Sequence, residues 1–437
     1  QWAIKSDRAR SARLLIDFGA DVNKPDEKLN TPLIYAAELN NYKMCKIMVN
    51  RGADPLHSNS KGRLASDYAY NYNGSAYRYL KIMEDLILSQ DTVPSMQDGP
   101  YIYLEPDDRI VMTYYQRDQA NNLTELKEKT IETGSGDTII DGFGWDDKSY
   151  HIRRNFVPDS DKIETAGDIF VVGDIHGKYD QLVHLLISNK IIDPQLHWTF
   201  GDGQLVFLGD LFDRGDEVTE LLWFLYELEI KARRSGGDVH VLLGNHEVMA
   251  MTGDHRYLDE KYAYFSKYTR IDYFQLYDKN TLLGRWLRSQ NLIVQINGYL
   301  FAHAGISPEF AAYNYSYSSI NSTIRDFLNS DSSLVDASPE DIILGPIGPQ
   351  WYRGYIAGDD GVPEITQQFV DDYTAVNGLK RMIQGHNEQL TINTAFDGKV
   401  VFADVAIDEA GKNSQGLLIS GDELYRCLSD GRKEPIE

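Results

Sequence analysis

Three short signatures between Phe170 and Glu247 hold the side chains of this sequence that are best suited to chemistry. They read Gly173-Asp174-Ile175-His176-Gly177, Gly209-Asp210-Leu211-Phe212-Asp213-Arg214-Gly215 and Gly244-Asn245-His246-Glu247. Asp174, His176 and Asp210 are ligands of the kind that suit Mn, Fe or Zn. Because Asp174 and His176 stand two residues apart, they can reach one ion only from an irregular turn, which the flanking glycines allow.

A second ion needs further ligands, and the chain offers them. Asn245 supplies an amide oxygen, Asp210 is a candidate bridge between two ions, and two imidazoles occur further along the chain. These are His303, in Ala302-His303-Ala304-Gly305, and His386, in Gln384-Gly385-His386-Asn387. Two ions about 4 Å apart would hold a water or hydroxide and clamp the attacking and leaving oxygens of a phosphoryl transfer. The residue types therefore predict two divalent metal ions (Mn, Fe or Zn).

Three residues beside these ligands suit other roles. His246 is a candidate general acid for the leaving group, and Asp213 is suited to orient its imidazole. Arg214 presents a planar fork that matches phosphate oxygens. A Gly-Asp-x-His-Gly sequence alone is equally readable as a turn, and Asp-Arg-Gly as a structural ion pair. Five such segments in order, each after an apolar run, favour a catalytic site over a purely structural one.

The apolar runs before these segments read as buried strands. They are Ile169–Val172, Leu205–Leu208, Val239–Leu243, Tyr299–Ala302 and Arg381–Gln384. Helical patterns at Lys178–Asn189 and Asp216–Ser235 follow the first two runs, which predicts a βαβαβ unit. Because the carboxyl ends of parallel strands meet at one edge of a sheet, we expect the polar side chains to converge there.

With these motifs the chain resembles the metal-dependent phosphoprotein phosphatases of the calcineurin-like superfamily. Within them it is most similar to the Shewanella-like protein phosphatases, and beside those to the symmetrical diadenosine-tetraphosphate hydrolases. The narrower resemblance rests on Leu242–Met249 continuing through Thr252–Tyr257, on Trp351–Tyr355 and on Asp98–Ile102. It covers roughly Gln97 to the C-terminus.

The resemblance implies an α/β metallophosphatase fold, a β-sandwich flanked by helices with two ions at its edge. It assigns to the first ion Asp174, His176 and Asp210, and to the second Asp210, Asn245, His303 and His386. Two departures from the family pattern, Ala304 after His303 and Asn387 after His386, leave every ligand in place and bear on fine specificity.

For the remaining residues, the resemblance implies a proton-donor pair of His246 and Asp213. It makes Arg214 and Arg353 phosphate clamps. Arg353 lies in an insert, Glu309 to Gly378, which we expect to act as a lid and specificity element. The other histidines read as structural, and His255 is the one exception because it closely follows the third signature.

The first 90 residues contain a repeat. Gly19-Ala20-Asp21 returns as Gly52-Ala53-Asp54, an offset of 33 (52 − 19), and Thr31-Pro32-Leu33 opens the clearest unit. This pattern resembles ankyrin repeats, each of two short helices and a turn. We expect an all-α repeat array over residues 1–90, a linker over 91–100 and a metallophosphatase domain over 101–437. The array is interpreted as a partner-binding surface or as a spacer docked on the phosphatase.

Between the array and the core, Tyr101–Leu104 and Ile110–Tyr115 predict a β-hairpin, and Asn121–Thr130 predicts a helix. The net charge of −23 argues against nucleic acid or an anionic membrane as a main partner. Cys45 and Cys427 read as two buried free thiols. No apolar run has the length of a membrane span, and we expect a cytoplasmic protein. The sequence begins within a repeat, which leaves open whether a targeting segment has been removed.

These observations lead to one main hypothesis and two alternatives. The main one is a metal-dependent protein phosphatase acting on phosphotyrosine or phosphoserine/threonine. Hydroxide held by the ions would attack phosphorus in line while His246 protonates the leaving oxygen. The alternatives are a dinucleoside polyphosphate hydrolase and an ankyrin-based binding protein with a vestigial metal site.

Overall fold

A computed structural model of the 437-residue chain describes residues 12, 15–16, 20–69, 75–88, 96–118, 123–134, 136–142, 146–269, 271–330, 338–356, 364–407 and 411–436. The chain forms two compact units, each assembled from separate segments. Unit 1 comprises Gln1–Asp98, Tyr115–Lys127 and Gly253–Gln275. Unit 2 comprises Gly99–Tyr114, Glu128–Thr252 and Leu276–Glu437.

The repeat region of unit 1 is helical, as predicted. It contains α3 (Pro32–Glu38), α4 (Tyr42–Asn50), the 3-10 turn η1 (Ser66–Tyr68) and α5 (Ser75–Leu88). Thr31 caps α3 through its side chain, and Pro32 stands in the first turn, where no backbone donor is needed. Most of the first predicted repeat lies outside the described residues.

A hydrogen-bonded pair of turns links successive repeats. Asn23 donates from Nδ2 to the Gly52 carbonyl at 2.7 Å, and its Oδ1 accepts from the Asp54 backbone at 2.8 Å. Asn23 lies two residues after the first Gly-Ala-Asp segment, and Asp54 is the last residue of the second. The 33-residue offset thus corresponds to stacked, equivalent turns.

Residues 253–275 are compact with the repeats in unit 1. They carry α9 (Glu260–Thr269) and the start of the 3-10 turn η2 (Tyr273–Tyr277). The Lys46 ammonium of α4 lies 2.7 Å from His255 Nδ1 and 2.8 Å from Asp272 Oδ1. Tyr42 Oη accepts a hydrogen bond from the His255 backbone at 2.9 Å. His255 therefore contacts the second repeat helix.

The strands ahead of the core partly differ from the prediction. β1 (Met96–Leu104), β2 (Arg109–Asp118) and β3 (Leu123–Glu132) form one sheet, and β4 (Thr138–Asp141) pairs with β5 (Ser149–Ile152). The predicted hairpin is confirmed as β1 and β2. The predicted helix over Asn121–Thr130 is wrong, because β3 occupies residues 123–130, while residues 121 and 122 lie outside the described residues. Its Glu and Lys content favours a helix in isolation, but pairing with β2 outweighs that propensity.

β1 also begins inside the stretch 91–100 that the sequence suggested as a linker. Residues 96–100 are strand, and residues 91–95 lie outside the described residues.

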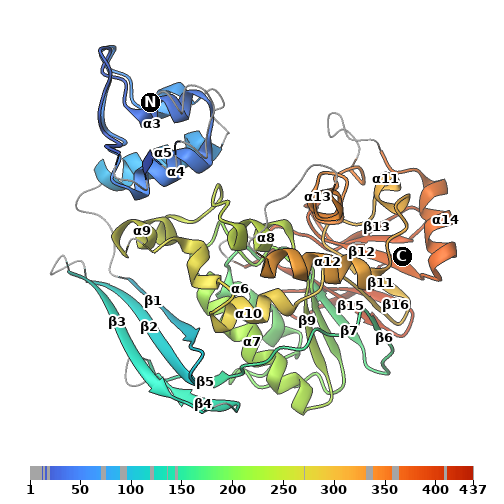
Figure 1. The fold of residues 1–437 in the computed structure, drawn as a ribbon. Helices are drawn as coiled ribbons and strands as arrows, with labels where there is room; N and C mark the ends of the chain where they lie inside the picture. The colour runs from blue at the N-terminus through green and yellow to red at the C-terminus, as the bar shows by residue number, and fades with distance from the viewer. Residues whose placement is uncertain are drawn as a thin grey trace. The chain divides into compact units, whose positions relative to one another are not determined.

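Unit 2 contains the predicted β-sandwich, made of two six-stranded sheets (Figure 1). In order, the first sheet is β13 (Asn393–Ala395), β14 (Val400–Phe402), β12 (Arg381–Gln384), β11 (Tyr299–Ala302), β10 (Ile293–Ile296) and β6 (Lys162–Ile163). The second is β17 (Lys433–Pro435), β16 (Glu423–Leu428), β15 (Gln415–Ser420), β7 (Ile169–Val172), β8 (Gln204–Phe207) and β9 (Asp238–Val241).

Each sheet has a parallel trio that sets the direction of the site. β7, β8 and β9 are parallel in one sheet, and β11, β12 and β14 are parallel in the other. Apolar side chains between the sheets, such as Val171 and Val206 facing Phe301 and Val401, form the core. Each such side chain contributes about 1.5–3 kcal/mol through removal from water. Packing of this kind holds the strand ends in a fixed arrangement.

Helices flank the sandwich. α6 (Tyr179–Ser188), α7 (Val218–Arg234) and α10 (Leu282–Ser289) pack together, with α7 against β9. The insert after His303 contains α11 (Pro308–Ala311), α12 (Tyr317–Asn329), α13 (Pro339–Leu344) and α14 (Gln367–Asn377), with α12 against β10 (Figure 1). α8 (Asn245–Thr252) begins at the third signature.

Both cysteines are buried and free, Cys45 in α4 and Cys427 in β16, as predicted. In the described part of the chain, no helix combines the length and apolarity that crossing a bilayer requires.

Candidate metal centre

The predicted ligands stand just past strand ends, on unusual backbone. Asp174 follows β7, Asp210 follows β8, His303 follows β11 and His386 follows β12, while Asn245 opens α8 after β9. His176, Asp210 and His386 have left-handed φ values of 50°, 55° and 60°. Non-glycine residues rarely adopt this conformation, and where they do it commonly marks a functional turn.

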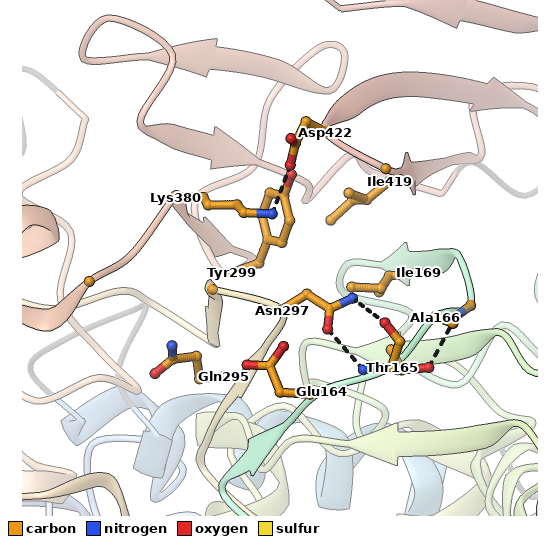
Figure 2. A pocket seen from close by; sticks show the side chains of 14 residues that line it. Glu164, Thr165, Ala166, Ile169, Gln295, Asn297, Tyr299, Lys380, Ile419 and Asp422 are labelled. Carbon is orange, nitrogen blue, oxygen red and sulfur yellow. Dashed lines mark hydrogen bonds and ion pairs between the residues drawn. The ribbon is translucent and has the colours of Figure 1, made fainter.

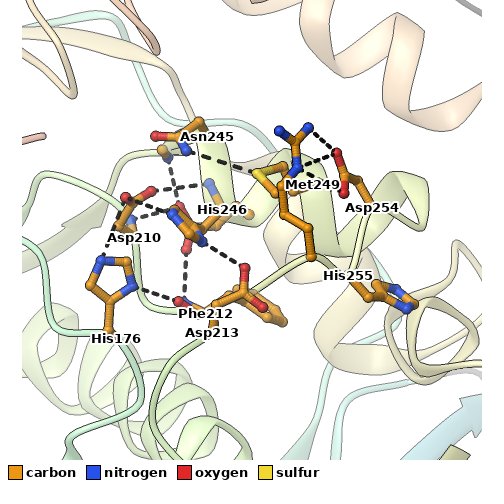
Figure 3. A network of polar contacts seen from close by, with 12 residues as sticks. His176, Asp210, Phe212, Asp213, Asn245, His246, Met249, Asp254 and His255 are labelled. Atoms are coloured by element: carbon orange, nitrogen blue, oxygen red, sulfur yellow. Dashed lines mark hydrogen bonds and ion pairs between the residues drawn. The ribbon is translucent and has the colours of Figure 1, made fainter. Parts of the chain in front are cut away.

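Asp210 lies at the centre of the site, and its two oxygens face different neighbours (Figure 3). Oδ1 is 3.3 Å from His303 Nε2 and accepts a hydrogen bond from the His246 backbone at 3.0 Å. Oδ2 is 3.8 Å from His176 Nε2 and 3.7 Å from His246 Nε2. A carboxylate placed in this way can bridge two ions.

On the Oδ1 side, four donor atoms converge. His303 donates from Nδ1 to the Leu208 carbonyl at 2.8 Å, which leaves Nε2 directed at the site. That Nε2 is 2.9 Å from Asn245 Oδ1 and 3.1 Å from His386 Nδ1. Atoms that share one ion at about 2.1 Å are themselves roughly 3 Å apart, so Asp210, Asn245, His303 and His386 fit a common ion.

Asn245 is oriented by a neighbour on its own helix. Its Nδ2 donates to Met249 Sδ at 3.9 Å. The amide oxygen is thereby turned toward His303 rather than away from it.

On the Oδ2 side, one ring nitrogen of His176 has no hydrogen-bond partner. Its Nδ1 donates to the Phe212 carbonyl at 2.8 Å, whereas its Nε2 is buried and has no hydrogen-bond partner. Burial lowers the pKa of His176 to about 3, so the imidazole is neutral and Nε2 carries a lone pair. A buried imidazole nitrogen without a partner is suited to ligating a metal ion.

The buried carboxylates of the site favour a positive charge between them, as a cation-binding site requires. Burial opposes a charge on His303, but the Asp210 and Asp174 carboxylates raise its pKa to about 10. In the metal-free chain His303 thus holds a proton, which an incoming ion would displace. Burial, with the neighbouring His303, holds the pKa of His386 well below its usual range.

Asp174 approaches the site from the β12 side. Its Oδ1 accepts from the His386 backbone at 3.1 Å and lies 3.9 Å from His303 Nδ1. A Cβ at Gly385 would stand 2.6 Å from that oxygen, so the glycine is needed for the approach. Among the described residues, no hydrogen bond or ion pair links Asp174 to His176. The two residues of the first signature thus reach the centre from different directions.

His246 and Asp213 form a buried pair beside this centre. Asp213 Oδ2 accepts from His246 Nδ1 at 2.6 Å, and the His176 and His246 rings meet edge to face at 4.7 Å (Figure 3). Burial disfavours the imidazolium, but the Asp210 and Asp213 carboxylates outweigh it and raise the pKa of His246.

The two predicted arginine clamps are exposed side chains at the margin of the site. The charge of Arg214 lowers the pKa of His176, and that of Arg353 lowers the pKa of His386, each after the larger effect of burial. Trp351 lies two residues from Arg353, with its ring perpendicular to His386 at 6.1 Å. The Trp351–Arg353 passage therefore lies beside His386, one of the predicted ligands.

Three residues of the site were not identified from the sequence. Glu247 is fully buried and accepts from the backbones of Asp210, Leu211, Phe212 and Gly244 at 2.7–3.3 Å, which ties two signatures together. Gln350 donates from Nε2 to the Leu243 and Gly244 carbonyls, both at 2.9 Å. Asp404 follows β14 in the same way that the predicted ligands follow their strands, and that position was the available signal.

Two other polar features of the chain do not form part of the centre. Asp159, Asp238 and His240 lie close enough to hold an ion, but Arg233 already bonds both carboxylates, at 2.6 and 2.8 Å. A polar pocket of about 600 Å³ lies beside Ile169 and Tyr299, the first residues of β7 and β11 (Figure 2). Since the predicted ligands follow the other ends of these strands, the pocket is separate from them.

Two parts of the chain match known protein families. A family model described as calcineurin-like phosphoesterase matches residues 167–387, and one described as ankyrin repeats (three copies) matches residues 1–59. An uncharacterized protein of Schizosaccharomyces pombe is 29% identical over 269 residues, covering 59% of this chain and 78% of that protein. Shewanella-like protein phosphatase 2 of Arabidopsis thaliana is 23% identical over 304 residues, covering 57% and 73%.

Among solved structures, the cold-active protein-tyrosine phosphatase of a psychrophilic Shewanella species superposes with a TM-score of 0.68. It is 31% identical to this chain, and the match covers 78% of this chain and 100% of that one. The matched family residues run from just before β7 through His386, and thus include every predicted ligand. This chain belongs to the calcineurin-like phosphoesterase family, a metallophosphatase family, and carries ankyrin repeats at its N-terminal end.

Proposed function

We propose that this chain is a phosphomonoesterase that acts on phosphorylated proteins with two divalent ions of Mn, Fe or Zn. The ligands would be Asp174, His176, Asp210, Asn245, His303 and His386. The observation that carries the proposal is the position of Asp210, whose two oxygens face two separate groups of donors. When bound, the ions would polarise a phosphoryl oxygen and lower the pKa of a water.

His246 would protonate the leaving oxygen. Its Nδ1 is held by Asp213, so Nε2 is the nitrogen available to the substrate. The raised pKa of His246 favours the imidazolium form that a general acid requires. Asp213 would orient the ring and balance its charge.

Arg214 and Arg353 would bind the phosphate. Both are exposed, and a guanidinium binds two phosphate oxygens at once. Their position matters because the chain as a whole carries a charge of −23 and would repel an anionic substrate. Local positive charge at the site margin would offset that repulsion.

Phosphotyrosine is the phosphoresidue we favour. The solved Shewanella relative, matched over its whole length, is a protein-tyrosine phosphatase. Trp351 offers an aromatic ring next to His386, where a substrate ring bound at the centre could pack. Phosphoserine and phosphothreonine would leave this surface unfilled.

The ankyrin repeats would serve to bind a protein, either the substrate or a regulator, and the insert that carries Arg353 would act as a lid. A stack of repeats presents an extended surface of the kind that recognises other proteins. Protein binding and phosphate ester hydrolysis would then be combined in one chain.

The test is phosphate release with Mn²⁺ from two peptides that differ only in phosphotyrosine or phosphothreonine, assayed beside a dinucleoside polyphosphate. His246→Ala serves as the blank. Turnover of a peptide, faster with phosphotyrosine, is the expected result. Turnover of the nucleotide alone would assign the chain to the dinucleoside polyphosphate hydrolases. A chain that binds no ion and releases no phosphate would be a binding protein with a vestigial site.

A further inference from the structure

Asp404 is a carboxylate of the centre that the six predicted ligands do not include. It follows β14, which pairs in parallel with β12 so that Gln384 stands opposite Phe402. His386 is two residues beyond Gln384, and Asp404 is two residues beyond Phe402. The register therefore places Asp404 beside His386, a predicted ligand, at the carboxyl ends of the paired strands β14 and β12. Only 4% of Asp404 is exposed.

A close approach of two strand ends brings Asp404 to Asp174. A Cβ at Gly173 would stand 2.5 Å from the Ala403 carbonyl oxygen and 2.7 Å from Asp404 Cα, so only glycine permits this spacing. Because Asp174 directly follows Gly173, this close approach puts Asp404 beside Asp174. Asp174 is therefore flanked by the His386 backbone N–H, which donates to its Oδ1, and by the strand end that carries Asp404.

The charge of this pair is poorly balanced by the protein. Among the described residues, no Lys, Arg or His nitrogen lies within 4 Å of the Asp404 carboxylate. The nearest basic atom to Asp174 is His303 Nδ1 at 3.9 Å, and that nitrogen already donates to Leu208. A divalent ion bound beside two buried carboxylates would balance their charge.

We propose that Asp404 is a seventh residue of the metal centre, a positioning residue that holds Asp174 and adds negative charge beside the ion that Asp174 ligates. This rests on the proposed function only in that an ion binds there. Partners that orient a metal ligand typically change metal affinity 10–100-fold when they are replaced. Asp404 would act in this way without contacting the substrate.

The experiment measures Mn²⁺ binding by the full chain with calorimetry, and metal content after dialysis by mass spectrometry. Asp404→Ala removes the carboxyl group, and Asp404→Asn keeps the shape but removes the charge. Glu388→Gln is the matched control, since it removes an exposed carboxylate whose charge reaches Asp404 but which is not in contact with Asp174. We expect both Asp404 variants to bind one of two ions at least about 10-fold more weakly, and the control to bind as the wild type does.

A second measurement separates this role from a purely structural one. In metal-free protein, Asp404→Asn keeps the size and shape of the side chain, so its urea midpoint should not fall below that of the wild type. A lower midpoint would indicate a structural role. Wild-type Mn²⁺ affinity in Asp404→Asn would show that the charge of Asp404 does not contribute to metal binding. Wild-type affinity in both variants would overturn the proposal.

The outcome is independent of substrate. If the wild type binds Mn²⁺ but hydrolyses none of the phosphate esters, the proposed function fails while the role of Asp404 is still decided by affinity. If the wild type binds neither Mn²⁺, Fe²⁺ nor Zn²⁺, both proposals fail.

Discussion

Asp213 Oδ2 accepts a 2.6 Å hydrogen bond from His246 Nδ1, and 2% of each residue is exposed. The bond sets the imidazole so that Nε2 points at Asp210 Oδ2, 3.7 Å away. Asp213 adopts a left-handed φ of 68°, next to Arg214 at 65°. The same strained turn therefore positions both the partner of the proton donor and one predicted phosphate clamp.

Replacing His246 should slow the reaction without releasing the ions. We expect His246→Ala to lower kcat by about 10²-fold or more on a phosphopeptide, the usual contribution of a general acid. The loss should be smaller on p-nitrophenyl phosphate, whose leaving group needs no proton. Steady-state kinetics on both esters check this, with metal content measured in parallel. Full activity of the variant on the peptide would refute the assignment.

Replacing Asp210 should instead cause the protein to lose its bound metal ions. Its two oxygens face both donor groups, and an amide offers only one oxygen and no charge. We expect Asp210→Asn to lose bound metal on dialysis, as measured by mass spectrometry. Asp202→Asn, an exposed position just before the other end of β8, is the control and should retain it. Unchanged metal content in Asp210→Asn would contradict a bridging role.

Glu247 should be needed for the shape of the second signature. It accepts four backbone N–H groups, and the single oxygen of a glutamine cannot satisfy them. We expect Glu247→Gln to lower the free energy of unfolding by at least about 2 kcal/mol, since hydrogen bonds to charged groups contribute about 1.5–3 kcal/mol each. Urea unfolding of metal-free protein measures the change. A difference below about 0.5 kcal/mol would show that the turn forms without this carboxylate.

His240 should make the fold sensitive to acid. It is buried in β9 with Nε2 bonded to Gln204 Oε1 at 2.8 Å, and burial holds its pKa below the ordinary value. The unfolded chain therefore takes up the proton first, and stability falls as the pH drops from about 6.5 through the folded-state pKa. Comparing unfolding midpoints of the wild type and His240→Gln at pH 8 and pH 5.5 isolates this contribution. The variant should lose less on acidification, and an equal loss would exclude His240 as a cause.

Lys46 and Asp272 should be energetically coupled within unit 1. Their 2.8 Å ion pair is largely buried, and burial lowers the pKa of Lys46 although Asp272 opposes the shift. A double-mutant cycle with Lys46→Met and Asp272→Asn should give a coupling of about 1–3 kcal/mol in the free energy of unfolding. The cycle requires all four proteins under one buffer condition. A coupling near zero would mean that this ion pair adds nothing to the other contacts between the repeat helix and residues 253–275, such as that of Tyr42 with His255.

The elements that carry the centre could be predicted because apolar runs and signatures alternate clearly. β11 and β12 have the predicted bounds, and β7 does as well. The prediction of a helix over Asn121–Thr130 was wrong because the local composition and the pairing in the folded sheet favour different structures. Leu123–Glu132 is rich in helix-forming residues, and only its pairing with β2 makes it a strand, which is information that the local sequence lacks.

Residue types also predicted which side chains would meet, but not how. Asp210, Asn245, His303 and His386 come together at about the distances a shared ion needs. The approach of Asp174 from the β12 side depends on Gly385 and on sheet register, neither of which is visible in a motif. Arg353 was available only through family resemblance. Glu247 stood in the third signature, but its four backbone partners belong to turns whose conformation the sequence did not reveal.

The membership of residues 253–275 in unit 1 bears on how such a protein could arise. In a modular protein, a repeat array can be gained or lost by fusing or deleting one continuous piece of a gene. Here the repeats are packed with a segment encoded directly after α8, whose first residues are Asn245 and His246. A transplanted array would find no matching Lys46–Asp272 pair or Tyr42–His255 contact. We therefore expect homologues that lack the repeats to keep the Thr252–Tyr257 passage but to differ at Asp272, so that Lys46 and its partner are inherited together.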